Sequence, residues 1–223
     1  ISGNDSFGSL DDTSRSDVDM LVTINPVTST ILMTSIPRDS YVEEVCDDYA
    51  CNYGAYDKLT HTGIYGVDTT KATVENLLGI DVNYVFRVNF TSMIDIVDAL
   101  GGIDIDVAEG MAVSKFYTNS TLEGVHEGTN HLDGKRALAY SRERKAYIDG
   151  DVQRARNQQQ VLQAMFKKAT SPEIITKYTS LLKALTHAFD TNMSTKEITS
   201  FIKYQIQAKP SWKFEQYVLK GDN

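Results

Sequence analysis

Residues 18–36 read VDMLVTINPVTSTILMTSI, and this stretch decides the fold. Two apolar, β-branched runs, residues 18–25 and 30–36, are separated by Pro-Val-Thr-Ser. Runs of this composition on either side of a short polar connection predict an antiparallel β-hairpin with a four-residue turn.

The register of this hairpin places charged residues together. With the turn centred between Val27 and Thr28, Asp17 lies opposite Arg38 and Arg15 lies opposite Ser40. Both polar clusters then meet at the open end of a rigid sheet, where binding sites commonly form.

Strand and helix patterns alternate along the rest of the chain. Expected strands are 82–90, 103–107 and 212–219. Expected helices are 69–78 (N-cap Asp68 or Thr69, Gly79 at its C-terminal end), 91–100 (N-cap Thr91), 151–169, 172–189 and 194–208. Residues 132–140 read as a helix or a turn, and residues 109–130 read as irregular. The pattern predicts a single α/β domain over residues 1–223, an α/β/α sandwich whose central mixed sheet contains the N-terminal hairpin and is flanked by helices.

Charge limits the kinds of partner. The formal net charge of the 223-residue chain is −8, which argues against a nucleic-acid-binding surface over the whole protein. Arginine has a rigid donor fork that suits phosphate and carboxylate. Six of the arginines nevertheless fall in a few short stretches: Arg15, Arg38, Arg142, Arg144, Arg154 and Arg156. This distribution indicates an anion site, and ordinary ion pairing is the alternative.

The sequence starts at Ile1-Ser2-Gly3 and contains no apolar run of the roughly 18 residues that a membrane span needs. We expect a fragment whose N-terminal membrane anchor lies outside it. Four residues separate Cys46 from Cys51, a spacing that permits a small disulfide and hence an extracytoplasmic location; two free thiols are the alternative.

Arg15 and Asp17 combine a cation and an anion just before the first long strand, on one side of an extended segment. Taken alone they read as an ion pair. A metal–phosphate centre needs the same combination, because Mg²⁺ prefers one or two carboxylates with phosphate oxygens and water. Asp5 is the candidate for a second carboxylate.

Two further pairs of residues are candidates for binding an anion. Arg142 and Arg144 are two residues apart, and such close like charges favour a bound polyanion or nearby carboxylates. Arg154 and Gln158 share one face of the expected long helix, so both can reach one phosphate. Glu143 is expected to point away from this group.

Lys58 is a candidate phosphate contact, and His61 reads either as a base or, more commonly, as a structural residue. Asp39 is either a base on the acceptor side or a structural partner of Arg38, the role we favour. The sequence has no Ser-His-Asp arrangement, glycine-rich P-loop or HExxH motif.

The ordered motifs resemble the LytR-CpsA-Psr family of Gram-positive, streptococcal-like cell-wall enzymes. The resemblance covers about residues 4–166. The matching motifs are SRSD (14–17), IPRD (36–39), KLTH (58–61), VNF (88–90), LGGI (100–103), LDG (132–134), AYSR (139–142), and Arg154 with Gln158-Gln159.

The resemblance implies a magnesium-dependent phosphotransferase anchored in the cell membrane with its catalytic domain outside. It would transfer a teichoic acid, capsular polysaccharide or similar glycopolymer from a polyprenyl (undecaprenyl) pyrophosphate carrier to peptidoglycan. An apolar tunnel for the lipid is also implied. Residue by residue, the pyrophosphate would be held by Arg15, Arg38, Lys58, Arg142, Arg144, Arg154 and Gln158, with Arg15, Arg38, Arg142 and Arg144 catalytic and Asp5 and Asp17 holding Mg²⁺. Asn157 stands where the family often has another arginine.

Two rival functions remain open from the sequence. The same site would serve a hydrolase that cleaves the polyprenyl pyrophosphate with water. A non-enzymatic regulatory role, such as transcriptional attenuation, is opposed by the acidic charge and by the absence of a helix-turn-helix pattern.

Overall fold

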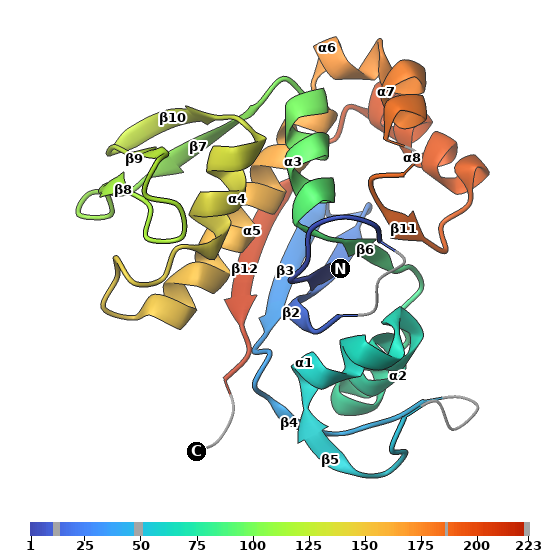
Figure 1. Ribbon diagram of the computed structural model, residues 1–223. Coiled ribbons are helices and arrows are strands. Elements are labelled where there is room, and N and C mark those ends of the chain that lie inside the picture. Colours follow the sequence, from blue (N-terminus) through green and yellow to red (C-terminus); the bar gives the residue numbers. More distant parts are fainter. Residues whose placement is uncertain (11–13, 47–50, 186, 221–223) are drawn as a thin grey trace. The chain divides into compact units, whose positions relative to one another are not determined.

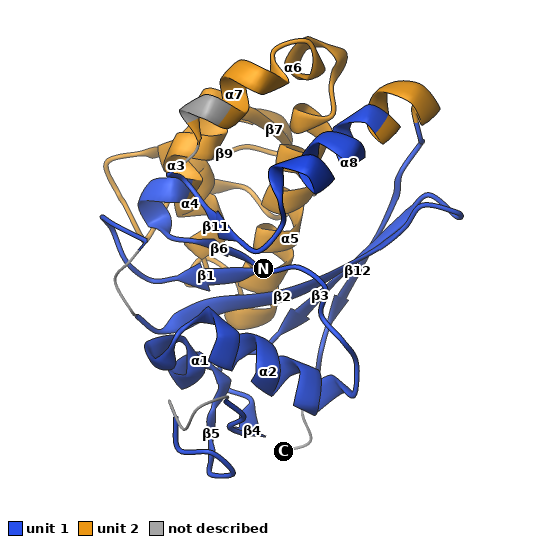
Figure 2. Ribbon diagram, turned by 90° about the vertical axis from the view of Figure 1, so that its right-hand side faces the viewer, with its two compact units in different colours: residues 1–92, 187–203, 210–223 blue, residues 93–186, 204–209 orange. Residues whose placement is uncertain are grey.

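The computed structural model describes residues 1–10, 14–46, 51–185 and 187–220 (Figure 1). By its internal contacts the chain divides into two compact units (Figure 2). Unit 1 comprises residues 1–92, 187–203 and 210–223, and unit 2 comprises residues 93–186 and 204–209. Among the described residues, no helix has both the length and the apolar character needed to cross a membrane.

Unit 1 is built on a mixed six-stranded sheet of order β11-β6-β1-β2-β3-β12. The hairpin lies between β1 and β12, and the antiparallel pairing of Asn25 with Thr30 leaves a four-residue turn at residues 26–29, as predicted. The strands β1 and β6, and likewise β3 and β12, pair in parallel. The strands are β1 (Ser2–Asn4), β2 (Ser16–Asn25), β3 (Thr30–Ile36), β6 (Phe86–Val88), β11 (Asp190–Thr191) and β12 (Lys213–Val218).

Short elements cover one face of this sheet (Figure 2). They are α1 (Leu59–Thr62), the 3₁₀ turn η1 (Gly63–Tyr65) and α2 (Val67–Leu78), with the two-stranded sheet of β4 (Tyr41–Glu43) and β5 (Tyr56–Lys58) beside them. Their apolar side chains pack into a buried cluster around Leu59, Val42, Val74 and Ile36. Unit 1 also holds the first part of α8 (Thr195–Ala208).

Unit 2 packs helices on strand pairs. Its elements are most of α3 (Phe90–Ala99), β7 (Ile103–Val107), β8 (Val113–Lys115), β9 (Glu123–Val125), β10 (Gly128–Leu132), α4 (Gly134–Arg142), α5 (Gly150–Ala169), α6 (Pro172–Ile175) and α7 (Tyr178–Ala184). Side chains alternate along β7, so that Ile103, Ile105 and Val107 are buried between exposed aspartates, as predicted. Together with Phe116 and Leu132 they form the core of this unit.

The predicted strand 82–90 is wrong over most of its length, because only Phe86–Val88 pairs in the sheet. The backbone N–H groups that a longer strand would need are used elsewhere. Val82 donates to Glu75 Oε1 (2.6 Å) and Val85 to Asn192 Oδ1 (2.8 Å).

Two predicted helix caps are also wrong. The helix expected from residue 69 begins at Val67, with Gly66 as its N-cap, although Gly79 ends it in the left-handed conformation as predicted. At α3 the cap is supplied by Asn89, whose Oδ1 accepts from the backbone N–H of Ser92 (2.9 Å). Thr91, the expected cap, accepts instead from the backbone N–H of Gly8.

Residues 109–130 were expected to be irregular, yet they form β8, β9 and the start of β10. The strands β8 and β9 approach closely because Gly124 has no side chain; a Cβ there would overlap the carbonyl of Val113. The helix expected over 172–189 is divided into α6 and α7, and residue 186 lies outside the described part of the chain. The β-branched run Ile174-Ile175-Thr176 lowers helix propensity at the break.

Candidate functional site

The candidate site residues fall into two groups, one in each unit. Unit 1 carries Asp5, Arg15, Asp17, Arg38 and Lys58. Unit 2 carries Arg142, Arg144, Arg154 and Gln158.

The open end of the hairpin brings Arg38 and Asp17 together. Arg38 Nη1 donates to Asp17 Oδ1 at 2.8 Å, which is the cross-strand relationship that the sequence predicted. Both side chains are half-buried, so the pair is less exposed to solvent than an ordinary surface ion pair.

A β-bulge turns Asp17 toward Arg38. Gly3 pairs with Val18, but the next residue, Asn4, pairs with Ser16, so Asp17 is the extra residue on β2. Bulges commonly re-aim a side chain next to a functional site. Here Ser16 stays inside, where its Oγ donates to Asp19 Oδ1 (2.7 Å), while Asp17 projects to its arginine partner.

Asp39 links two cations in unit 1. Its carboxylate accepts from Lys58 Nζ at 2.7 Å and lies 3.6 Å from Arg38 Nε. The same region is fixed by backbone hydrogen bonds, because Thr60 N–H donates to the Arg38 carbonyl (2.9 Å). Asp39 is therefore a structural partner of both Arg38 and Lys58.

Gly63 lets the turn after α1 pack directly on the arginine-bearing segment. A Cβ on Gly63 would lie 2.6 Å from both the Ser14 carbonyl oxygen and the Ser16 backbone nitrogen. The guanidinium of Arg15 is exposed and forms no ion pair with any described residue. Asp5 is exposed, and its backbone N–H donates to the Arg15 carbonyl (3.4 Å), which places both at the adjoining ends of β1 and β2.

His61 belongs to a different contact network. Its Nδ1 lies 2.8 Å from Asp57 Oδ2, and this hydrogen bond is the main reason that the pKa of Asp57 is lowered. Asp57 occupies the central position of β5, so its side chain points away from the face that bears Lys58. Nearby Glu44 is buried, and desolvation raises its pKa. These contacts favour a structural role for His61.

In unit 2 an aspartate again holds two cations. Asp151 Oδ1 lies 3.2 Å from Arg154 Nη2 and 3.7 Å from Arg144 Nη1. The Asp151 side chain is 69% exposed, so its oxygens are open to exchange with a dissolved anion. Arg144 and Arg154 thus converge on one anionic group.

The backbone around Arg144 is rigidly set. Glu143 is fully buried and accepts backbone N–H groups from Tyr117 (2.6 Å), Arg144 (3.0 Å) and Ala146 (3.3 Å). It therefore points inward, away from the arginines, as predicted. Gly150 permits close packing as well, because a Cβ there would lie 2.6 Å from the Arg144 carbonyl oxygen.

Arg142 ends α4, and Gln158 lies one turn after Arg154 on α5, half-buried. Asn157 is fully buried, with its Nδ2 donating to the Tyr140 carbonyl (3.1 Å), so it ties α5 to α4 and offers nothing to a ligand. The bridging role of Asp151 was missed by the sequence reasoning. Its signal was present, since an aspartate three residues before Arg154 lies on the same helix face.

Cys46 and Cys51 form a disulfide bond, the first of the two alternatives that their spacing left open. Cys46 is buried, and its backbone continues directly from β4 after Glu44 and Val45. The disulfide is therefore joined to the same strand pair that carries Lys58.

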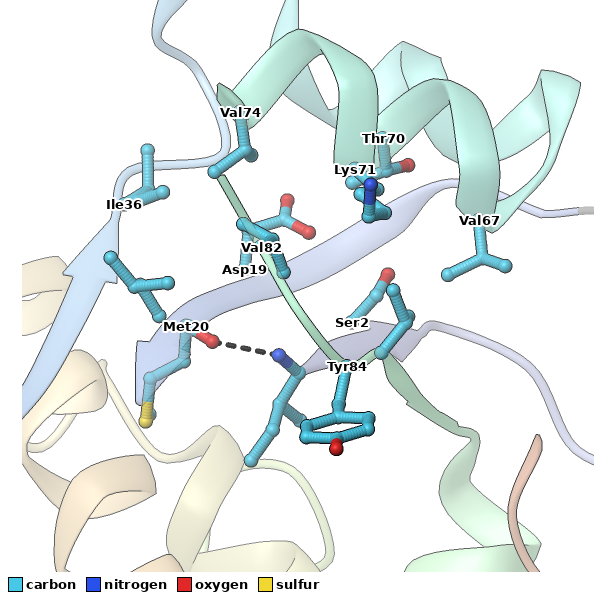
Figure 3. Close-up of a pocket in the computed structure, with 13 residues that line it drawn as sticks. Ser2, Asp19, Met20, Ile36, Val67, Thr70, Lys71, Val74, Val82 and Tyr84 are labelled. Carbon is cyan, nitrogen blue, oxygen red and sulfur yellow. Dashed lines mark hydrogen bonds between the residues drawn. The ribbon is translucent and has the colours of Figure 1, made fainter. Parts of the chain in front are cut away.

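A small pocket of about 40 Å³ lies in unit 1 between β1, β2 and α2 (Figure 3). Apolar side chains such as Val67, Val74 and Val82 form most of its lining, and Asp19 projects from β2 into it. Ligand pockets are commonly about 300 Å³ or larger. This pocket does not have room for a polyprenyl chain, so the lipid tunnel stays a prediction.

Solved structures support the fold. Protein gbs0355 from Streptococcus agalactiae matches with a TM-score of 0.83 at 30% identity, over 99% of this chain and 75% of that one. A structure described as TagT bound to LI-WTA matches with a TM-score of 0.77 at 32% identity, over 99% of this chain and 77% of that one. The predicted α/β fold with a central mixed sheet flanked by helices is confirmed.

Sequence comparison gives the same grouping. The chain is 37% identical over 191 residues to the polyisoprenyl-teichoic acid–peptidoglycan teichoic acid transferase TagU of Bacillus anthracis, covering 84% of this chain and 58% of the relative. It is also 37% identical over 199 residues to the transferase TagT of Bacillus subtilis strain 168, covering 88% and 59%. The chain thus spans less than two thirds of the length of these relatives. The model of the LytR_cpsA_psr family matches residues 1–223, and the chain belongs to that family.

Proposed function

We propose that this chain carries out phosphoryl transfer, moving a phosphate-linked glycopolymer from a polyprenyl-pyrophosphate carrier to peptidoglycan. The observation that carries the proposal is the convergence of Arg144 and Arg154 on the single exposed carboxylate of Asp151. Two guanidinium groups held in this way form a preorganised receptor for a phosphate, which makes charge-assisted hydrogen bonds to arginine. Membership of a family with relatives named as teichoic acid transferases supports the same activity.

The chemistry follows from where charge develops. Breaking the pyrophosphate linkage places negative charge on the leaving phosphate and on the transferred phosphoryl group. Arg144 and Arg154 would stabilise that charge, with Arg142 and Gln158 from the same unit as further contacts. The family resemblance adds Arg38, Arg15 and Lys58 of unit 1 as proposed pyrophosphate contacts. Fixed charges need no reorganisation during the reaction, which is the main source of their catalytic effect.

Mg²⁺ is proposed as the cofactor, held by Asp17 and Asp5. The donor set fits this ion, because Mg²⁺ takes one or two carboxylates and completes its octahedron with phosphate oxygens and water. Asp17 has one oxygen engaged by Arg38, and Asp5 is exposed at the adjoining strand end. No cluster of three or more His, Cys, Asp or Glu side chains suited to a metal occurs among the described residues. The ion would neutralise charge on the pyrophosphate oxygens.

The location and partners follow from this activity. We propose that the domain works on the extracytoplasmic face of the cell membrane, attached by an anchor outside this sequence. Its substrates there would be the undecaprenyl-pyrophosphate-linked glycan, whether teichoic acid, capsular polysaccharide or a similar polymer, and peptidoglycan. The Cys46–Cys51 disulfide supports this compartment, because disulfides persist in oxidising surroundings.

The proposal is tested with a lipid-pyrophosphate-linked glycan donor incubated with the protein and Mg²⁺, with and without peptidoglycan. Conjugate that forms only in the complete mixture is the expected result. Donor cleavage at an unchanged rate without conjugate would assign the hydrolase function instead. Tight, salt-sensitive binding to duplex DNA, with no donor cleavage, would favour the regulatory role.

A further inference from the structure

An exposed pair of tyrosines stands on the outer face of the β4–β5 sheet. Tyr41 is 72% exposed and Tyr56 is 58% exposed. Their ring centroids are 5.6 Å apart and the ring planes are inclined by 36°. Two large amphipathic rings exposed side by side offer an apolar surface with hydrogen-bonding hydroxyl groups at its edge.

The strand register fixes both rings on one face. Tyr41 pairs with Lys58 and Glu43 pairs with Tyr56, so these four side chains lie on the same side of the sheet. The intervening residues of the two strands, Val42 and Asp57, point to the other side, where Val42 is buried. The outer face of the sheet, bearing Tyr41, Glu43, Tyr56 and Lys58, is called the tyrosine face below.

The tyrosine face continues into the proposed reaction site. Lys58 Nζ donates to Asp39 Oδ1 at 2.7 Å, and Asp39 contacts Arg38. The backbone is continuous as well, since Leu59 N–H donates to the Ser40 carbonyl (2.9 Å) and extends the β4–β5 ladder to the residue after Asp39. A chain molecule lying on the two rings would therefore have one end beside Arg38.

We propose that the tyrosine face binds the glycan strand of peptidoglycan, the acceptor, and this inference rests on the proposed function. The apolar C–H faces of pyranose rings stack on aromatic side chains, and the spacing of the two rings is comparable to one sugar unit along a chain. Tyrosine hydroxyl groups supply hydrogen bonds to the sugar hydroxyl and acetamido groups.

The charge of the tyrosine face favours the peptidoglycan acceptor over the donor polymer and over an anionic lipid surface. The one cation of this face, Lys58, is paired with Asp39, while Glu43 forms no ion pair with another described residue. A polyanionic glycopolymer and an anionic lipid surface both need excess positive charge. A neutral, N-acetylated glycan strand does not. The tyrosine face therefore fits the acceptor and not the donor polymer or the membrane.

The test compares Tyr41→Ala and Tyr56→Ala with two controls. Tyr41→Phe keeps the ring, and Tyr217→Ala removes a tyrosine that is 53% exposed on β12 of the same unit. Each alanine variant is expected to raise KM for teichoic-acid-free peptidoglycan by about three- to tenfold, as expected for loss of an aromatic contact. KM for the lipid-linked donor is expected to stay unchanged. Tyr41→Phe should retain most of the acceptor affinity, and Tyr217→Ala should match the wild type.

Direct binding separates failure of this inference from failure of the proposed function. Binding to teichoic-acid-free sacculi and to N-acetylglucosamine oligomers is expected to weaken in both alanine variants, whether or not the wild type forms conjugate. An unchanged affinity and an unchanged acceptor KM would overturn the inference while leaving the transferase function standing. A raised donor KM, or loss of binding to anionic phospholipid vesicles in place of sacculi, would overturn it in favour of the donor or the membrane. Thermal unfolding of each variant confirms that the fold is intact.

Discussion

Arg38 and Asp17, separated by 21 positions in the chain, are joined by a 2.8 Å ion pair across the open end of the β2–β3 hairpin. The hairpin register brings them opposite each other, and the bulge at Asp17 turns its carboxylate toward the guanidinium. Asp17 lies within β2, and Arg38 lies two residues after the end of β3, in a turn closed by the hydrogen bond from the Ser40 N–H to the Pro37 carbonyl (2.9 Å). The carboxylate of Asp17 and the guanidinium of Arg38 therefore lie together where a metal–phosphate complex is proposed to bind.

Asp17→Asn is expected to abolish most transfer activity and to weaken Mg²⁺ binding. The amide keeps the shape of the side chain but loses the negative charge that a hard divalent cation needs. Calorimetric titration with Mg²⁺ in the presence of inorganic pyrophosphate, together with the Mg²⁺ dependence of transfer, measures both effects. Asp106→Asn, an equal charge change on an exposed strand position bonded to Thr129, is the control. A variant stimulated by the same Mg²⁺ concentrations as the wild type would point to other ligands.

The hairpin could be predicted from sequence because two local signals agree on one register. The apolar runs set its two strands, and the four-residue connection sets their alignment. The strand expected over residues 82–90 failed for the opposite reason. Its backbone donor at Val85 is taken by the side chain of Asn192, which lies 107 positions further along the chain. A partner so distant leaves no mark on the local pattern.

The candidate site, like the fold, was predicted from the sequence only in part. The Arg38–Asp17 contact follows from the strand register, and the inward direction of Glu143 follows from its place between two arginines. The contacts of Asp39 with Arg38 and of Asp151 with Arg154 are local in the chain, whereas those of Asp39 with Lys58 and of Asp151 with Arg144 depend on side-chain positions that spacing does not fix. The close packing at Gly63 was equally hidden, since a glycine after a short helix is ordinarily read as a turn residue.

Arg144→Ala and Arg154→Ala are each expected to weaken binding of inorganic pyrophosphate by about tenfold or more. Each removes charge-assisted hydrogen bonds of roughly 1.5–3 kcal/mol, and transfer activity should fall further because charge grows in the transition state. Arg156→Ala is the matched control, since Arg156 is an exposed arginine on the same helix. Equal losses in all three variants would indicate a general charge effect in place of a binding site.

Asp151→Asn is expected to increase pyrophosphate affinity, the opposite direction to the arginine variants. Asp151 is an anion that both Arg144 and Arg154 contact in this structure, and a bound phosphate must compete with it. Removing its charge ends that competition. Isothermal titration with pyrophosphate at low ionic strength measures the change, because salt screens exposed charges. Weaker binding by the variant would mean that Asp151 positions the arginines productively.

Replacing Cys46 and Cys51 together by serine is expected to lower the free energy of unfolding by about 2 kcal/mol, as closure of a short loop restricts the unfolded chain. The change is measured by urea denaturation under oxidising conditions. Adding a reductant to the wild type should give the same loss, and adding it to the double variant should change nothing. A wild type insensitive to the reductant would contradict a stabilising role for this bond.

Asp19→Asn is expected to stabilise the protein at pH 8 and to flatten its stability between pH 4 and pH 7. Asp19 is 4% exposed, one of its oxygens has no hydrogen-bond partner in the described structure, and desolvation raises its pKa from 3.8 to about 7. Between those values the folded protein keeps a proton that the unfolded chain releases. The free energy of unfolding therefore falls as pH rises through this range, by an amount on the order of 4 kcal/mol.

Asparagine resembles the protonated acid and can still accept from Ser16 Oγ, so the variant should escape this loss. Urea denaturation at pH 4, 6 and 8 measures the difference between variant and wild type, which is expected to be small at pH 4 and to grow with pH. Asp106→Asn controls for the change in net charge, because that aspartate is exposed. A difference that stays constant across the three pH values would show that Asp19 ionises as readily in the folded protein as in the unfolded chain. Burial of its carboxyl group would then carry no electrostatic cost, and the pocket around it would have to admit water.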